Sequence, residues 1–204
     1  MGCSRGHGTT DPSCASRATE RPGFPAAGLS GATTACDAAH QEIPPVKAAG
    51  SEYVSVRYRT RTPGTEETVP WRIMGMVAGT TLTYDPPQTT APATLGAGQL
   101  VEFEATGPFD VKSQDAMHPF YLAGHMTGGS LAGGLGDPET VNIAPPAQYL
   151  HMPVGNCDNG LHTISSTAPF GVTVWGFDQW VSYAYPAGAS VKPINNVVVP
   201  PTLQ

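Results

Sequence analysis

The chain has 204 residues, and its 10 Lys and Arg against 16 Asp and Glu leave a net charge of −6 at pH 7. Charged residues make up only 13% of the chain, about half the usual share, whereas the 24 glycines and 21 prolines exceed it. The absence of a Lys/Arg cluster excludes an electrostatic basis for nucleic-acid binding, and no apolar run reaches the roughly 20 residues of a membrane-spanning helix. Because Gly and Pro weaken helices, we expect an all-β fold.

The first 50 residues differ from the rest in their residue pattern, because no apolar periodicity there reaches the length of a strand. We predict a disordered or loosely structured leader over residues 1–50, with a short helix near residues 36–42. No apolar segment of a signal peptide follows Met1, so we expect either a cytosolic protein or a fragment or mis-started copy of a longer secreted one. The cysteines permit two disulfides in three connectivities. They are Cys3, Cys14, Cys36 and Cys157.

From residue 51 onward, short segments of alternating apolar and polar residues are separated by turns rich in Gly and Pro. An alternation with period two is typical of a β-strand with one buried face. The glycine-rich stretch 124–136 is predicted to be a linker or a mobile loop. We therefore predict one β domain over residues 51–204. Its expected strands are 52–60, 69–76, 80–84, 100–105, 109–113, 119–126, 161–166, 170–176 and 180–185, with short apolar pieces at 141–143 and 147–150.

Two segments of the predicted domain, 100–113 and 161–174, resemble each other. The shared residues are Leu100, Thr106, Pro108, Phe109 and Val111 in the first copy and Leu161, Thr167, Pro169, Phe170 and Val172 in the second. Each copy is predicted to form a hairpin whose turn is fixed by Pro and whose return strand starts at Phe-x-Val. The fold class is therefore predicted to be an antiparallel β-sandwich or tandem β units related by duplication, at about 51–126 and 141–199.

No residue pattern in the chain indicates catalysis. The side chains of a type that binds metals are His118, His125, His151, His162, Asp115, Asp137 and Asp158. Their spacing matches no metal-ligand motif. Ser130 lacks the Gly-x-Ser-x-Gly register of a nucleophile elbow, and the glycine-rich stretch lacks the Lys of a phosphate-binding loop. We therefore predict no catalytic, cofactor-binding or metal-binding residues, no cofactor, and no enzymatic activity.

An ordered series of short motifs resembles one family. The motifs are Trp71-Arg72-Ile73, Thr80 to Pro87, Gly98 to Phe103, His118 to Leu122, Gly136 to Glu139, Pro145 to Tyr149 and Ser182 to Gly188. From about Cys36 to about Pro201 the chain resembles the IgGFc-binding domain, found at the N-terminus of the mucus IgG Fc-binding protein and in many bacterial secreted proteins. Only residues 151–160 fill an interval that is longer in the family, so the chain is expected to be a shortened copy.

The resemblance implies an extracellular or cell-surface β module that binds proteins or mediates adhesion, and it brings no catalytic residues. Its expected partner is a host or cell-surface protein or glycoprotein. Two alternatives stay open on the sequence. One is a calcium- or glycan-binding, lectin-like module, with a site around Asp137, Glu139 and His125. The other is a structural spacer without a ligand.

Overall fold

The computed structural model describes residues 41, 43–64, 66–148, 165–179, 181–187 and 193–198. This part contains β-strands, all paired antiparallel, and three short 3₁₀ helices, so the predicted all-β fold is confirmed. Within the described ranges no helix is long and apolar enough to cross a membrane. The elements are η1 (Val46–Ala48), β1 (Glu52–Ser55), β2 (Val69–Gly75), β3 (Thr80–Asp85), β4 (Thr94–Leu95), β5 (Leu100–Ala105), β6 (Phe109–Ser113), β7 (Phe120–Met126), η2 (Gly129–Ala132), β8 (Glu139–Asn142), η3 (Pro146–Gln148), β9 (Val172–Asp178) and β10 (Val181–Ala187).

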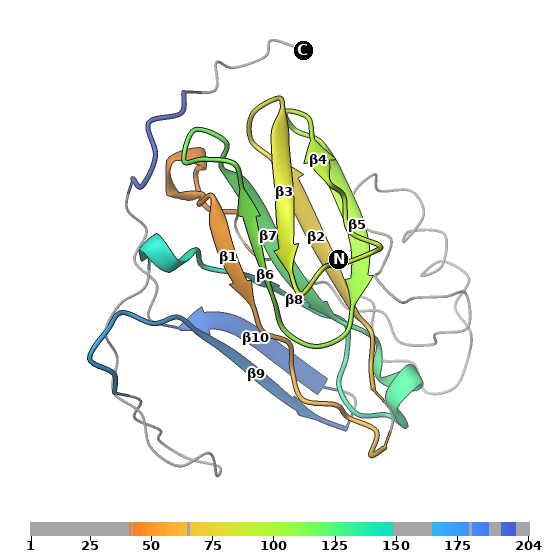
Figure 1. The fold of residues 1–204 in the computed structure, drawn as a ribbon. Helices are drawn as coiled ribbons and strands as arrows, with labels where there is room; N and C mark the ends of the chain where they lie inside the picture. The colour runs from red at the N-terminus through yellow and green to blue at the C-terminus, as the bar shows by residue number, and fades with distance from the viewer. Residues whose placement is uncertain are drawn as a thin grey trace, which may run out of the picture.

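The strands form two four-stranded sheets and a separate hairpin. One sheet has the order β1-β6-β3-β4 and the other the order β5-β2-β7-β8, while β9 and β10 pair with each other and with no other strand of the described ranges. Figure 1 shows the first sheet in front of the second, with the β9–β10 hairpin below both. The layering is that of a β-sandwich, in which side chains of the two inner faces form one core.

Aromatic side chains fill the space between the two sheets. Trp71 on β2 meets Phe109 on β6 edge-on, with ring centroids 5.2 Å apart, and Phe103 on β5 lies 5.8 Å from Phe109. Trp71 is fully buried. On β1, Tyr53 and Ser55 face this core, so the exposed positions of that strand are the alternate ones. Burial of large rings supplies much of the driving force for folding.

The predicted hairpin at 100–113 is not formed. β5 pairs with β2 in one sheet, whereas β6 pairs with β1 and β3 in the other, so the chain crosses between the layers after Ala105. Gly107 at the crossing has a φ of +66°, which a residue with a side chain rarely adopts, and Pro108 has no N–H for a ladder. Phe103 and Phe109 therefore face each other from opposite sheets. The second copy of the repeat falls partly outside the described residues, and β9 pairs with β10.

The predicted boundaries, at residue 50 and between residues 126 and 141, do not coincide with breaks in the packing of the domain. Ala48 and Ala49, at the end of the predicted leader, are buried, and Gly50 bridges to Phe120 of β7. β8 pairs with β7 and so joins the same sheet as β2 and β5. The division into repeated units stays a prediction, as does the structure of residues 1–40, which lie outside the described ranges.

The glycine-rich stretch after β7 is anchored by a buried arginine. The Arg61 guanidinium donates to Glu67 Oε1 at 2.7 and 3.0 Å, to the carbonyl oxygens of Thr127 and Leu135 at 2.8 and 2.9 Å, and to the Thr127 hydroxyl. It also lies 5.1 Å from the centre of the Tyr58 ring. Every N–H of the guanidinium thus has a partner, and two loops distant in sequence are held together. The segment predicted to be a linker or a mobile loop is therefore tied to the domain at Thr127 and Leu135.

Removal of this guanidinium is expected to destabilise the domain strongly. In Arg61→Ala, the buried Thr127 carbonyl and the partly buried Glu67 carboxylate and Leu135 carbonyl would lose their donor. Breaking a buried pair typically costs about 3–5 kcal/mol of the free energy of unfolding, so a loss of up to this size is expected. Arg61→Lys keeps the charge but has fewer donors, so an intermediate loss is expected. Urea denaturation followed by tryptophan fluorescence measures both.

The matched control is the exposed ion pair of Lys112 with Glu52, whose nitrogen and oxygen lie 2.9 Å apart. Both side chains are about half exposed, so Lys112→Ala should leave the midpoint of unfolding almost unchanged. Equal midpoints for Arg61→Ala and Lys112→Ala would contradict the anchoring role of Arg61.

Candidate binding surface

The outward face of the β9–β10 hairpin is apolar and open to solvent. Val181, Tyr183 and Tyr185 alternate along β10, and between 48% and 54% of each is exposed. The three side chains share one face of the hairpin because residues two apart on a strand lie on the same side of the sheet. Ala184, between the two tyrosines, is buried on the opposite face. Large apolar side chains exposed side by side are typical of an interaction surface.

The two tyrosines form an ordered pair. Their ring centroids are 6.1 Å apart and the ring planes differ by 17°. Tyr183 lies opposite Gly176 of β9, and a Cβ added to Gly176 would come within 2.1 Å of Tyr183 Cζ. The Tyr183 ring therefore leans across β9 into the space that the glycine leaves free. Tyrosine is well suited to recognition, because it offers a large rigid surface with a polar end.

The inward face of the hairpin packs against the sandwich. Trp175 and Phe177 of β9 lie against the hydrophobic core. Trp175 meets Tyr58 edge-on at 5.3 Å, and the Arg59 guanidinium lies 5.1 Å from the centre of the Phe177 ring. These contacts partly bury one face of the hairpin and leave the tyrosines of the other face exposed to solvent.

Polar contacts hold the hairpin beside β8. The Gln41 side chain accepts a hydrogen bond from Asn142 N on β8 at 2.8 Å and donates one to Ala184 O on β10 at 2.9 Å. Ser182 Oγ donates to Asp137 O at 2.8 Å and accepts from Asp137 N at 3.2 Å. The two strands are thus joined through side chains.

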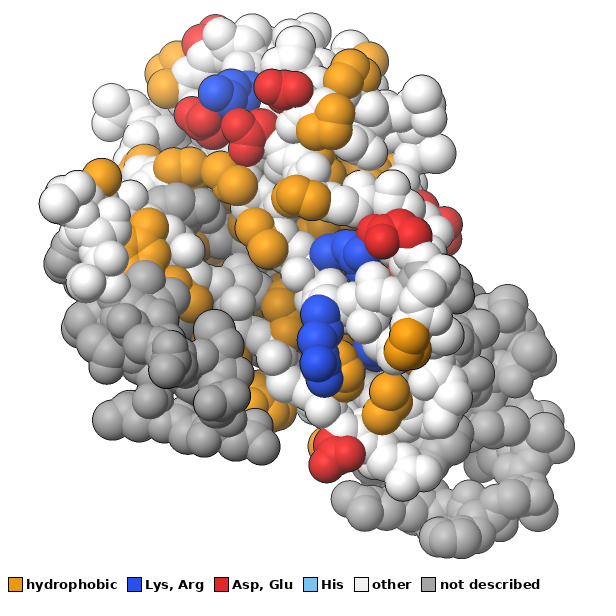
Figure 2. Space-filling model, turned by 60° about the horizontal axis from the view of Figure 1, so that its bottom comes forward, with side chains coloured by type: hydrophobic (Ala, Val, Ile, Leu, Met, Phe, Trp, Pro, Cys, Tyr) orange, Lys and Arg blue, Asp and Glu red, His pale blue; other side chains and the backbone are white. Residues whose placement is uncertain are grey.

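An apolar groove opens between β1 and the start of β9. Its volume is about 390 Å³, and it is lined by Val54, Val56, Ile143, Ala144, Phe170, Gly171, Val172 and Thr173. Val54 and Val56 belong to the exposed positions of the β1 segment. Figure 2 shows the molecule from below, where hydrophobic side chains form a band with Lys and Arg side chains near it. The volume lies within the roughly 300–1,000 Å³ of pockets that take small molecules.

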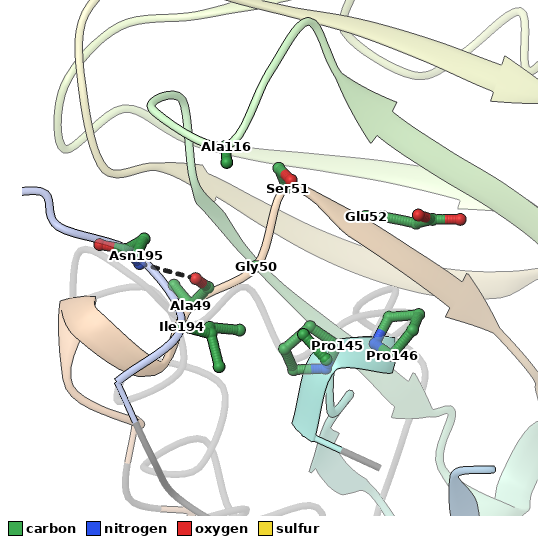
Figure 3. Close-up of a pocket in the computed structure, with 10 residues that line it drawn as sticks. Ala49, Gly50, Ser51, Glu52, Ala116, Pro145, Pro146, Ile194 and Asn195 are labelled. Carbon is green, nitrogen blue, oxygen red and sulfur yellow. Dashed lines mark hydrogen bonds between the residues drawn. The ribbon is translucent and has the colours of Figure 1, made fainter. Parts of the chain in front are cut away.

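A second cavity, shown in Figure 3, is much smaller, with a volume of about 110 Å³. Pro145 and Pro146 lie on one side of it, and Ile194 and Asn195 on another. Asn195 Nδ2 donates to Ala49 O at 2.8 Å. Its lining residues thus tie the C-terminal segment to the start of the domain, and the cavity has room only for a group of a few atoms.

His125, one of the side chains of a type that binds metals, is buried on β7. Burial first, and the nearby positive charge of Arg72 second, together lower the pKa of His125 to about 3. Arg72 in turn forms an ion pair with Glu102. Nε2 of His125 lies 3.5 Å from the Thr140 hydroxyl. A histidine that stays neutral here fits a structural role.

The other side chains of a type that binds metals do not converge within the described part of the chain. His118 and Asp115 lie together in the exposed β6–β7 loop, 2.7 Å apart, and the hydrogen bond from His118 lowers the pKa of Asp115. Glu139 Oε1 accepts from the backbone N–H of Thr140 at 2.8 Å. In the described part of the chain, no three His, Cys, Asp or Glu side chains are placed to hold a metal ion. The side chain of Ser130 and the residues His151, Asp158, His162, Cys3, Cys14, Cys36 and Cys157 lie outside what the structure describes.

Sequence reasoning missed the surface described above. Residues 180–185 were predicted as a strand, and the alternation of Tyr183 with Ala184 was visible in the sequence. Which of the two faces becomes buried depends on where the hairpin docks. The pairing of β9 with β10 and the contact of Trp175 with Tyr58 decide that.

The geometry is that of an antiparallel β-sandwich domain with an apolar hairpin face and an apolar groove. The family model of the IgGFc binding protein matches residues 23–154. This is more than half of the chain, so the chain belongs to the IgGFc-binding protein family. The match includes β1 to β8 and ends before β9. Comparisons with curated proteins and with solved structures found no match.

Acid is expected to destabilise the domain through His125. Its pKa is about 3 in the folded chain, whereas an unfolded histidine titrates near 6.5, so between these values only the unfolded chain binds the proton. The contribution of His125 to stability is complete above pH 6.5 and is lost as the pH falls towards 3, at up to about 1.4 kcal/mol per pH unit.

Urea denaturation at a series of pH values measures this slope. In His125→Gln, the slope between pH 6 and pH 4 should become shallower. Met117→Ser is the matched control, because Met117 is an exposed, non-titrating residue of the β6–β7 loop, and it should keep the wild-type slope. An unchanged slope in His125→Gln would show that His125 is protonated, or accessible to water, in the folded chain.

Proposed function

We propose that this chain is a non-enzymatic binding module that acts outside the cell or at the cell surface and contacts a protein or glycoprotein. The observation that carries the proposal is the exposed face of β10, formed by Val181, Tyr183 and Tyr185. Tyrosine is enriched at protein interfaces, and aromatic side chains there often dominate the binding energy. The family to which the chain belongs is named for binding the Fc part of immunoglobulin G, which makes Fc the first partner to test.

The composition of the face favours a protein partner over a membrane or a nucleic acid. Beside the tyrosines, β9 contributes Val174 opposite Tyr185 and Asp178 opposite Val181. An apolar centre with a polar edge is the usual arrangement of a protein interface. The chain as a whole is negatively charged, which opposes binding to anionic lipids or phosphates.

A glycan is the second candidate ligand, favoured by the nearly parallel rings of Tyr183 and Tyr185. Such rings offer flat apolar surfaces on which a sugar ring can lie. The calcium-dependent form of this alternative requires a metal-binding group, which the described residues do not assemble. A chelator therefore separates the calcium-dependent and the calcium-independent forms.

Substitution of both tyrosines is expected to abolish binding while the fold remains. The experiment measures binding of the purified full chain to immobilised Fc, to intact mucin and to deglycosylated mucin, by biolayer interferometry with and without EDTA. We expect binding to Fc or to both mucins, and a loss of at least about tenfold in affinity in Tyr183→Ser/Tyr185→Ser.

The matched control is Met117→Ser, which removes an equally exposed apolar side chain from the β6–β7 loop. It should bind like the wild type. Binding to intact mucin alone would favour the glycan alternative. A wild-type chain that binds none of the three, or a double variant that binds like the wild type, would refute the role of the β10 face. Protease treatment of intact cells of the source organism tests the location, since only a surface protein is cleaved.

A further inference from the structure

Within the described ranges, β1 has a strand partner on one edge only, where it pairs with β6. Ser113 N donates to Ser51 O at 2.9 Å, so the odd-numbered residues of this segment point their main-chain groups at β6. The even-numbered residues therefore point theirs to the other side. No main-chain partner of Val54 or Val56 is found within the described ranges. A free edge of this kind is the site at which extended peptides add to sheets.

The free edge is limited to the second half of β1. At its start, Pro145 and Pro146 lie beside Gly50 and Glu52, where they line the small cavity of Figure 3. Prolines carry no amide donor, so they cover this part of the edge without extending the sheet. The accessible edge therefore begins near Val54.

The groove lies along this accessible edge, and its two walls run in the same direction. Val54 and Val56 line it together with residues 170–173. Further along both segments, Tyr58 meets Trp175 and Arg59 meets Phe177, so residue numbers rise together on the two sides. The groove is thus closed near Tyr58 and opens towards Val54. A strand that enters it can run antiparallel to both walls, the more stable direction of pairing.

An unpaired positive charge marks the closed end of the groove. Arg59 is exposed, and its guanidinium lies over the Phe177 ring. Within the described residues Arg59 has no carboxylate partner, whereas neighbouring Arg57 is paired with Glu66. A partner with an acidic residue at this end would complete the pair.

We propose that the groove beside β1 takes an extended segment of the partner protein, which adds as an antiparallel strand to the edge at Val54 and Val56. The segment carries apolar residues at alternate positions, and these fill the groove next to the two valines. An acidic residue on its N-terminal side meets Arg59. This inference rests on the proposed function, because it supplies the partner's second contact next to the tyrosine face.

A synthetic peptide, Asp-Ser-Val-Thr-Val-Thr with blocked ends and a fluorescent label, tests the proposal by fluorescence anisotropy with the full chain. We expect saturable binding that weakens at least fivefold in Val54→Ser/Val56→Ser. Val198→Ser, which changes another exposed valine, is the matched control and should bind like the wild type. Near-UV circular dichroism verifies that each variant is folded.

Two further comparisons address the mode of binding. N-methylation of one alternate set of peptide amides should weaken binding at least tenfold, because that set pairs with the edge of β1. Arg59→Glu should weaken binding of the Asp peptide and strengthen binding of the same peptide with Lys in place of Asp. The proposal is overturned if the peptide does not bind, if neither set of N-methyl groups weakens binding, or if the valine variant binds like the wild type.

The outcomes separate this inference from the proposed function. If the chain binds Fc or mucin through its tyrosines but does not bind the peptide, strand addition is refuted and the proposed function of the β10 face stands. If the chain binds the peptide but binds no protein through its tyrosines, the proposed function of the β10 face is refuted and strand addition stands.

Discussion

The contact between Trp71 and Phe109 joins the two sheets, and the arrangement of the other elements follows from it. Trp71 is on β2, which has neighbours on both sides, and Phe109 begins β6, which also has neighbours on both sides. The contact between the two rings sets the position of β2, a central strand of one sheet, relative to β6, a central strand of the other. The chain must then cross from β5 to β6 between layers, which the conformation of Gly107 allows. This strand order also leaves β1 at one edge of its sheet.

The β9–β10 hairpin adds to this sandwich as a third unit, attached by contacts of two kinds. Tyr58 and Arg59 pack on the inner face of β9, and Gln41 and Asp137 contact β10 through hydrogen bonds that involve side chains. A two-stranded hairpin is marginal when isolated, so its order depends on this docking. The docking buries Ala184 and exposes the tyrosines, and it also forms one wall of the groove beside β1. Docking of the hairpin thus creates both the exposed tyrosine face and the groove beside β1, the two parts of the proposed binding surface.

Buried polar side chains hold the periphery of the fold. Arg61 binds the glycine-rich stretch, and His125 and Arg72 lie buried in the second sheet. Burial of such groups requires that their hydrogen bonds be made, which restricts the structure more narrowly than apolar packing does. None of the three has the spacing of a catalytic motif, and in the sequence a charged residue ordinarily indicates a surface position.

The sequence by itself determined the all-β class, the family and the positions of most strands, because period-two alternation and Gly/Pro turns are local properties of the chain. Strands predicted at 100–105 and 109–113 form with those bounds, and that predicted at 69–76 differs by one residue. Only the tertiary structure decided that 100–113 crosses between sheets, that Arg61 is buried, and which face of β10 stays open. Each of these depends on contacts between residues far apart in the chain. Alternation shows that Tyr183 and Ala184 lie on opposite faces, but the neighbour that covers one of them is set by the docking of the hairpin.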